Sequence, residues 1–274
     1  MDKFKRIIIK VIKLIRKPVM SILPGQLSFF LLLSLIPILL LMGVICNILS
    51  LPTNDIISAL KISLPANTSS LLIPLLSNSK MDYNILILII SSIILISKGT
   101  RSIMRVATTI YENEDKNTLI NLIKSIVLAV ILVLLFAFLI VIPILGTKIL
   151  DFFHNFKIIS SLSDNLIKMY DILKWPFSIF VVFINIKLLY MFSPSKRIPS
   201  KNVNKGAIFT TFFWIILTAI YSFYITNISS YNLYYGGASN LIILMLWVYF
   251  ISYIFVLGMC INASSQSNDL HDIK

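Results

Sequence analysis

The sequence predicts an all-α, polytopic membrane protein with six transmembrane helices, an N-terminal interfacial amphipathic helix and both termini in the cytoplasm. Its 274 residues are 58% hydrophobic and 13% charged, and the mean hydropathy is +0.92. Soluble domains have about 45–50% apolar and about 25% charged residues. A chain this apolar cannot cover its surface with polar side chains in water, so a soluble domain and an intrinsically disordered chain are both excluded.

Six apolar stretches approach the roughly 20 residues that a membrane-spanning helix needs. The second reaches this length only if its helix continues through Lys98, Gly99 and Thr100. The predicted spans cover, approximately, residues 27–49, 84–100, 123–145, 175–192, 207–228 and 240–263. They form one transmembrane domain, residues 25–263, between an N-terminal segment, 1–24, and a cytoplasmic tail, 264–274.

The basic residues predict the orientation. Seventeen of the 24 Lys and Arg residues lie in the terminal segments, in the connections after the second and fourth spans or at the span ends that adjoin those connections, and six lie on the opposite side. Because cytoplasmic loops carry the excess of Lys and Arg, both termini are predicted to be cytoplasmic. The net charge of +13 therefore indicates topology and contact with anionic lipid headgroups, and no nucleic-acid partner is predicted.

Residues 3–17 have the pattern of an amphipathic helix. Apolar side chains recur at helical spacing, and basic side chains fill most of the remaining arc. Such a helix lies in the membrane interface with its apolar face in the lipid. Pro18 is predicted to end it, and Pro24-Gly25 to turn the chain into the first span. The helix is either an orientation anchor or a lipid-sensing or partner-binding element.

Two long segments on the predicted outer side, residues 50–83 and 146–174, contain short apolar stretches interrupted by polar residues. They are predicted to form pieces of interfacial helix. These pieces either shield a cavity that opens outward or pack over the rim of the bundle.

The first span contains polar groups that are costly in lipid and tend to face a bundle interior. Gln26 and Ser34 share one helical face, and Pro37 leaves a backbone carbonyl without its helical donor near mid-membrane. These three residues are candidates for a polar transport face. The alternative is a kink that packs against neighbouring helices.

Four basic residues within or near predicted spans are candidates for anion binding. Lys98, Arg101 and Arg105 are spaced i, i+3 and i+7, so a continuous helix aligns them into a basic rail. Such a rail can receive the phosphate of a lipid or another anion. Lys187, inside the fourth span, is a further candidate. The alternative is that these side chains extend to the interface and only set the topology.

The sixth span supplies hydrogen-bond donors within the membrane, from Trp247, Tyr249 and Tyr253. Tyr249 and Tyr253 are one helical turn apart. The three residues either line a polar path or form hydrogen bonds between helices.

The sequence contains no motif that predicts catalysis. Nucleophile, phosphate-binding, dinucleotide-binding and zinc-protease motifs are absent, and no catalytic residue, metal site or cofactor is predicted. The acidic run of residues 112–115 is interpreted as a solvated surface segment.

Three separated stretches carry a set of motifs in a fixed order. The first, residues 25–37, reads GQLSFFLLLSLIP. The matching residues of the second and third stretches are Ser97, Gly99, Tyr111, Gly206, Trp214, Tyr235, Gly236, Trp247, Tyr249 and Gly258. Together these motifs resemble the YihY/BrkB family of bacterial integral membrane proteins. Cys260 stands where that family commonly has Glu.

The resemblance implies a six-span protein of the bacterial cytoplasmic membrane whose function is transport or translocation of a lipid or another amphipathic envelope component. A non-transporting envelope scaffold is the alternative. The ribonuclease name once given to the family is the least favoured, because the sequence lacks a nuclease ligand set. No oligomeric state is predicted.

Overall fold

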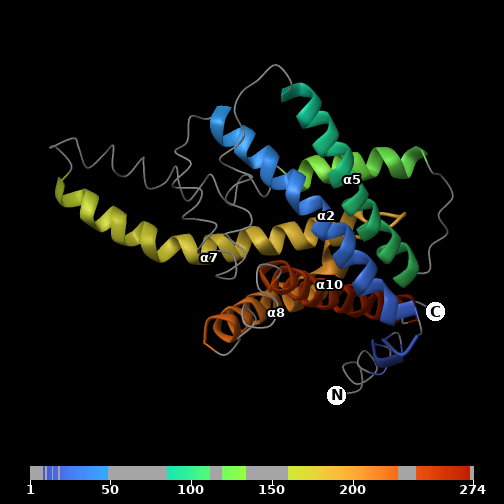
Figure 1. Ribbon diagram of the computed structural model, residues 1–274. Helices are drawn as coiled ribbons and strands as arrows, with labels where there is room; N and C mark the ends of the chain where they lie inside the picture. Colours follow the sequence, from blue (N-terminus) through green and yellow to red (C-terminus); the bar gives the residue numbers. More distant parts are fainter. Residues whose placement is uncertain are drawn as a thin grey trace.

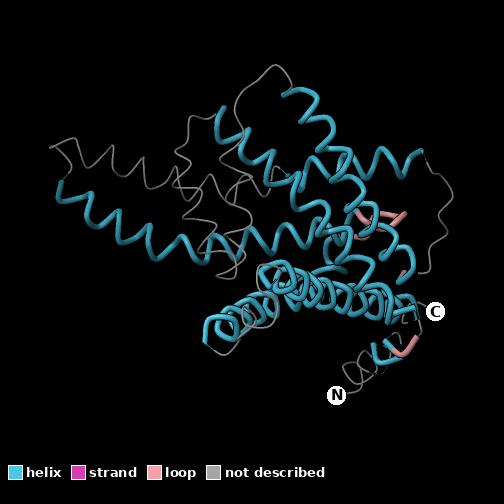
Figure 2. Tube along the Cα trace, viewed as in Figure 1, coloured by secondary structure: helices cyan, strands magenta, loops and turns pink. Residues whose placement is uncertain are grey.

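The computed structural model describes residues 9, 11–13, 15–17, 19–48, 85–111, 119–133, 160–227 and 239–271. Every regular element within these ranges is an α-helix, as the fold class predicted (Figure 1, Figure 2). The labelled helices are α2 (Val19–Ile48), α5 (Ile85–Ile110), α7 (Ser160–Phe192), α8 (Ser200–Asn227) and α10 (Ser239–His271). A further helix covers Leu119–Val133, between α5 and α7.

Three of these helices contain segments long and apolar enough to cross a membrane: Met20–Ile45, Ser200–Tyr224 and Leu241–Ser265. Two shorter apolar helical segments cover Leu119–Val133 and Pro176–Phe192. Residues 50–83 and the second half of the third predicted span lie outside the described residues. An all-helical chain with several spanning-length apolar helices has the architecture of an integral membrane protein.

The start of α2 differs from the prediction. The chain turns at Arg16 and Lys17, as a helix end at Pro18 requires, but α2 then begins at Val19 and runs through Pro24-Gly25 without a turn. The prediction that Pro24-Gly25 turns the chain is therefore wrong. Pro24 is the sixth residue of α2, so its missing amide hydrogen costs the helix one hydrogen bond, to the Met20 carbonyl, and the helix continues past it.

The second predicted span is one continuous helix. α5 passes through Lys98, Gly99 and Thr100 and ends at Ile110, so the continuation on which this span depended is confirmed. The basic residues of this region consequently lie on the helix itself and not in a loop.

α7 begins at Ser160, well before the predicted fourth span. Residues 160–174 are part of this helix and are not a separate interfacial piece, although Pro176 lies within it. Figure 1 shows the N-terminal half of α7 extending beyond the other labelled helices. A short turn, residues 193–199, then leads into α8, and the amide of Ile198 donates to the carbonyl of Met191 at 3.2 Å across that turn.

The helices pack in pairs around a main core. α2 packs against α5, α10 packs against both α8 and α2, and α7 packs against α8 (Figure 1). Five core side chains, one from each of these helices, are fully buried: Leu27, Val106, Tyr190, Val203 and Met259. The core therefore joins the starts of α2 and α8 to the ends of α5, α7 and α10.

Candidate functional site

The candidate residues from the sequence do not form one site. The structure distributes them over a crossing of α2 and α5, an exposed face of α5, the interface of α8 with α10, and a pocket between α2 and α10.

At the first location, Ser34 packs directly against Gly99. A β-carbon on Gly99 would lie 2.8 Å from Ser34 Oγ and 3.0 Å from Ser34 Cβ. Ser34 is buried and its hydroxyl donates to the Leu31 carbonyl within its own helix at 2.8 Å. Pro37 is also buried, and Gln26 is half-buried. Ser34 therefore contributes to the close packing of α2 on α5.

The basic rail lies on one side of α5. Lys98 and Arg105 are exposed, and Arg101 is half-buried between them. The opposite side of the helix carries the core residues Ile103, Val106 and Ala107. Because α5 is continuous, the rail extends over two turns of one rigid helix. Lys187 lies apart from it on α7, where its ammonium group is 5.7 Å from the centre of the Phe183 ring.

Two glycines allow the backbones of α8 and α10 to meet. A β-carbon on Gly206 would overlap the carbonyl oxygen of Gly258, and a β-carbon on Gly258 would overlap Thr210 Oγ1 and the Tyr190 hydroxyl. The Gly206 amide also donates to Asn262 Oδ1 at 2.7 Å. Close approach through small residues is characteristic of helix packing in membranes.

The same interface continues along both helices through aromatic donors. Trp214 Nε1 donates to the Ile251 carbonyl at 2.9 Å, and the Tyr221 hydroxyl donates to the Ile243 carbonyl at 2.7 Å. Trp247 Nε1 is 3.4 Å from Thr218 Oγ1. Trp247 therefore forms a hydrogen bond between helices, which is one of the two roles predicted for it.

Tyr190 joins α7 to both of these helices. Its buried hydroxyl donates to the Phe255 carbonyl on α10 at 2.7 Å. It lies 2.7 Å from Thr210 Oγ1 on α8, so the Thr210 hydroxyl is the donor in that bond. Its ring packs on Phe255 with centroids 4.7 Å apart. A single side chain thus fixes the positions of three helices.

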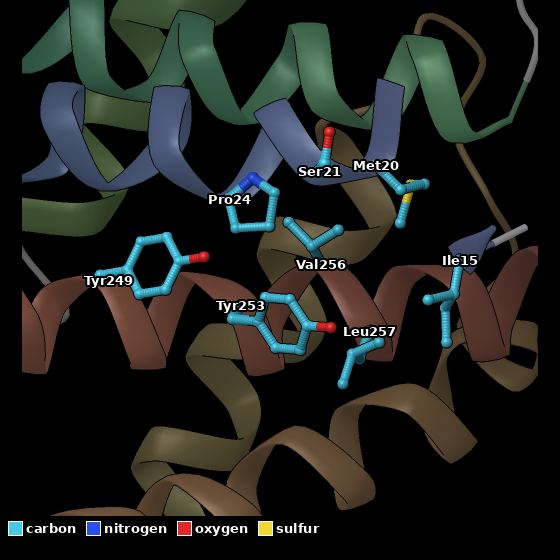
Figure 3. A pocket seen from close by; sticks show the side chains of 8 residues that line it. All are labelled: Ile15, Met20, Ser21, Pro24, Tyr249, Tyr253, Val256 and Leu257. Atoms are coloured by element: carbon cyan, nitrogen blue, oxygen red, sulfur yellow. The ribbon is translucent and has the colours of Figure 1, made fainter. Parts of the chain in front are cut away.

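A pocket lies between the N-terminal segment, the start of α2 and α10 (Figure 3). Its volume is about 280 Å³. Tyr249 and Tyr253, both partly exposed, lie side by side along α10 with ring centroids 6.4 Å apart. Neither phenol forms a hydrogen bond with any residue that the structure describes. The lining residues are Ile15, Met20, Ser21, Pro24, Tyr249, Tyr253, Val256 and Leu257.

Tyr111 follows the last residue of α5 and packs against the core. Its hydroxyl is buried and has no hydrogen-bond partner among the described residues. Burial, and secondarily the nearby Cys260 thiol, raise the pKa of this phenol above its ordinary range. Tyr111 is therefore a neutral group, and Cys260 is a free, buried thiol. Tyr235 and Gly236 lie outside the described residues.

Sequence reasoning missed two residues that organise the bundle. Tyr190 lies at the end of a predicted span, where a tyrosine resembles an ordinary interfacial aromatic residue. Lys124 is one of the seventeen basic residues that the sequence assigned to the cytoplasmic side, yet its ammonium group donates to the carbonyls of Pro194 at 3.2 Å and Ser195 at 3.0 Å. Both residues act through partners distant in sequence, which no local pattern reveals.

Comparison with known proteins identifies relatives among bacterial proteins. The family model described as Virulence factor BrkB matches residues 16–273. The chain is similar to the ribonuclease-like protein YfkH of Bacillus subtilis, with 29% identity over 243 residues, which are 87% of each chain. It is also similar to a UPF0761 membrane protein of Alteromonas mediterranea, with 40% identity over 70 residues, 26% of this chain and 24% of that protein. No solved structure matches the chain.

Four described motif residues of the third stretch lie along one helix interface, and a fifth, Tyr249, lines the pocket between α2 and α10. Gly206, Trp214, Trp247 and Gly258 all lie at the interface of α8 with α10. The family match spans nearly the whole chain and agrees with its all-helical architecture. The chain therefore belongs to the BrkB family, YihY/BrkB, of integral membrane proteins.

Proposed function

We propose that this protein moves a lipid or another amphipathic anion across or along the membrane. The observation that carries this proposal is the basic rail of α5. Lys98, Arg101 and Arg105 follow one side of an uninterrupted helix that packs in the bundle by its opposite side. Cations held in a line from the interface into the membrane give an anionic headgroup successive favourable positions.

The proposed topology has six spans, with both termini in the cytoplasm of a bacterial cell and the protein in its cytoplasmic membrane. Its support is the composition of the core, which joins the starts of α2 and α8 to the ends of α5, α7 and α10. In the predicted topology, these five helix ends all lie on the cytoplasmic side. Cysteine accessibility in intact cells tests this: a cysteine near Lys201 should react only from the cytoplasm, and one near Tyr231 only from outside.

Flux through reconstituted vesicles tests the transport activity. The vesicles contain phosphatidylglycerol, phosphatidylcholine and a trace of headgroup-labelled phosphatidylglycerol. We expect the label to equilibrate between leaflets faster with protein than without it. Each basic residue near an anionic surface contributes about 1 kcal/mol, so replacing both Lys98 and Arg101 with Ala should slow the exchange roughly thirtyfold.

The matched control replaces Lys196 and Lys201 with Ala. Both are exposed basic residues, and neither lies on α5, so flux should remain at the wild-type rate. A rate equal to that of empty vesicles for both anionic and zwitterionic labels would refute transport. Equal slowing by the two double variants would refute the role of the rail.

The alternative function is a non-transporting scaffold that organises envelope proteins. In this alternative, the motif residues Gly206, Trp214 and Gly258 serve the packing of α8 on α10. In that case the vesicles show no flux. Envelope proteins that co-purify with one another from wild-type cells should no longer do so from cells that lack this protein. We propose no enzymatic activity, and the purified protein should leave RNA intact despite the ribonuclease-like name of its relative.

A further inference from the structure

We infer that the pocket between α2 and α10 binds one phospholipid with an anionic headgroup, from the leaflet nearest the N-terminal segment. Such a lipid is a fixed structural ligand and not the transported molecule itself. This inference shares with the proposed function only the anionic headgroup of the lipid. Its test measures lipid binding and not flux.

The pocket presents polar groups in an order that fits a phospholipid. Leu257, Tyr253 and Tyr249 follow one another on α10 at intervals of four residues, which correspond to about 6 Å each along a helix. Figure 3 shows both phenol hydroxyls pointing along the pocket toward Leu257 and Ile15. Because neither phenol has a hydrogen-bond partner among the described residues, each can donate to an ester oxygen at the level where a glycerol backbone lies.

The charged end of the pocket lies at the N-terminal segment. Ile15 and Met20 both line the pocket, and the chain between them carries Arg16 and Lys17, whose side chains are exposed. Met20 begins a segment long and apolar enough to span a membrane, so Arg16 and Lys17 precede that segment at the level of lipid phosphates. The positive charges complement an anionic headgroup.

The opposite end of the pocket suits an acyl chain. Pro24 and the ring of Tyr249 form its walls there, one to two turns inside the membrane segment of α2. Pockets for small ligands have volumes of about 300–1,000 Å³. A volume of about 280 Å³ lies just below this range, so the pocket has room for only the glycerol region and the upper part of one chain, and the remainder of the lipid lies along the helix surface.

Native mass spectrometry of the full-length protein tests this site. The protein is equilibrated separately with phosphatidylglycerol and phosphatidylcholine of identical chains, and the fraction carrying one lipid is measured. We expect wild-type protein to retain phosphatidylglycerol more strongly. Leu257→Trp should fill the pocket and abolish the preference, while Tyr253→Phe and Arg16→Gln, which each remove one polar interaction, should weaken retention about fivefold.

Two matched controls keep the test specific. Tyr224→Phe removes a phenol on α8 whose side chain is 38% exposed, as is that of Tyr253, and Lys201→Gln removes an exposed charge on the same helix. Both should retain lipid like the wild type. Equal retention of both lipids by wild-type protein, or undiminished retention by a folded Leu257→Trp variant, would overturn the site. If the wild-type protein forms dimers and Leu257→Trp does not, the pocket binds a second copy of the chain and not a lipid.

The proposals of transport and of lipid binding in the pocket can be refuted independently. If Leu257→Trp loses bound phosphatidylglycerol while vesicle flux is absent in every variant, the binding site stands and transport does not. If flux persists at the wild-type rate and no variant changes lipid retention, transport stands and the site does not.

Discussion

Gly206 of α8 and Gly258 of α10 face each other so closely that neither helix has room for a β-carbon at that point. The contact lies beside the Tyr190 hydroxyl, which joins α7 to the same crossing. This crossing therefore holds α7, α8 and α10 together. Substitutions that disturb it should lower the stability of the protein.

Gly206→Ala and Gly258→Ala should each destabilise the protein. The added methyl group would meet backbone or buried polar atoms, and inserting such a group into a packed core costs about 1–3 kcal/mol. The measurement is the fraction of protein that remains monodisperse after heating in detergent.

Gly25→Ala is the matched control, because a β-carbon there meets nothing within 4 Å. Alanine in a helix is favoured over glycine by roughly 0.5–1 kcal/mol, so this variant should be as stable as the wild type or more stable. Retained heat stability in Gly206→Ala would show that the two helices can separate at little cost.

Gly99→Ala should weaken the crossing of α2 and α5. The new β-carbon would lie 2.8 Å from Ser34 Oγ and 3.3 Å from the Phe30 carbonyl oxygen. Ser34→Ala alone should have little effect, because its hydroxyl bonds only within its own helix in the described structure. Combined with Gly99→Ala it should restore part of the stability, since it removes the closest clash. A double variant no more stable than Gly99→Ala would contradict this coupling.

The two glycine contacts also show what the sequence could and could not predict. The length and hydropathy of the apolar stretches predicted helices, and the run of residues through Lys98–Thr100 predicted the continuation of α5. The pattern could not show that Ser34 faces Gly99, because the contact depends on how two distant helices cross. The prediction of a polar face in the first span therefore rested on helical spacing alone and could not include this packing contact.

For the remaining candidates too, the sequence predicted the position on a helix but not the contacts with other helices. The i, i+3, i+7 spacing placed Lys98, Arg101 and Arg105 on one side of α5, as observed. The hydrogen bond of Trp247 to α8 and the role of Tyr190 both required the tertiary arrangement. Periodicity predicts which residues share a face of a helix, and only packing shows whether that face meets lipid, another helix or a pocket.

Tyr190→Phe should lower stability more than Thr210→Val. The phenol donates to Phe255 and accepts from Thr210, so its removal eliminates both bonds and leaves two buried partners. Thr210→Val leaves the bond to Phe255 intact. Hydrogen bonds inside membrane proteins contribute about 0.6–1.7 kcal/mol each. Thermal unfolding in detergent should therefore rank Tyr190→Phe below Thr210→Val, and Tyr253→Phe, which loses no such bond, should match the wild type.

Lys124→Met should loosen the turn between α7 and α8. The ammonium group of Lys124 holds the carbonyls of Pro194 and Ser195, and hydrogen bonds to charged groups contribute about 1.5–3 kcal/mol before solvent exposure reduces them. Hydrogen–deuterium exchange of residues 193–199 should become about tenfold faster, since about 1.4 kcal/mol corresponds to that factor. Lys196→Met removes an equal charge from an exposed side chain of the same turn and should leave the exchange unchanged. Identical acceleration in both variants would attribute the effect to net charge and not to the two bonds.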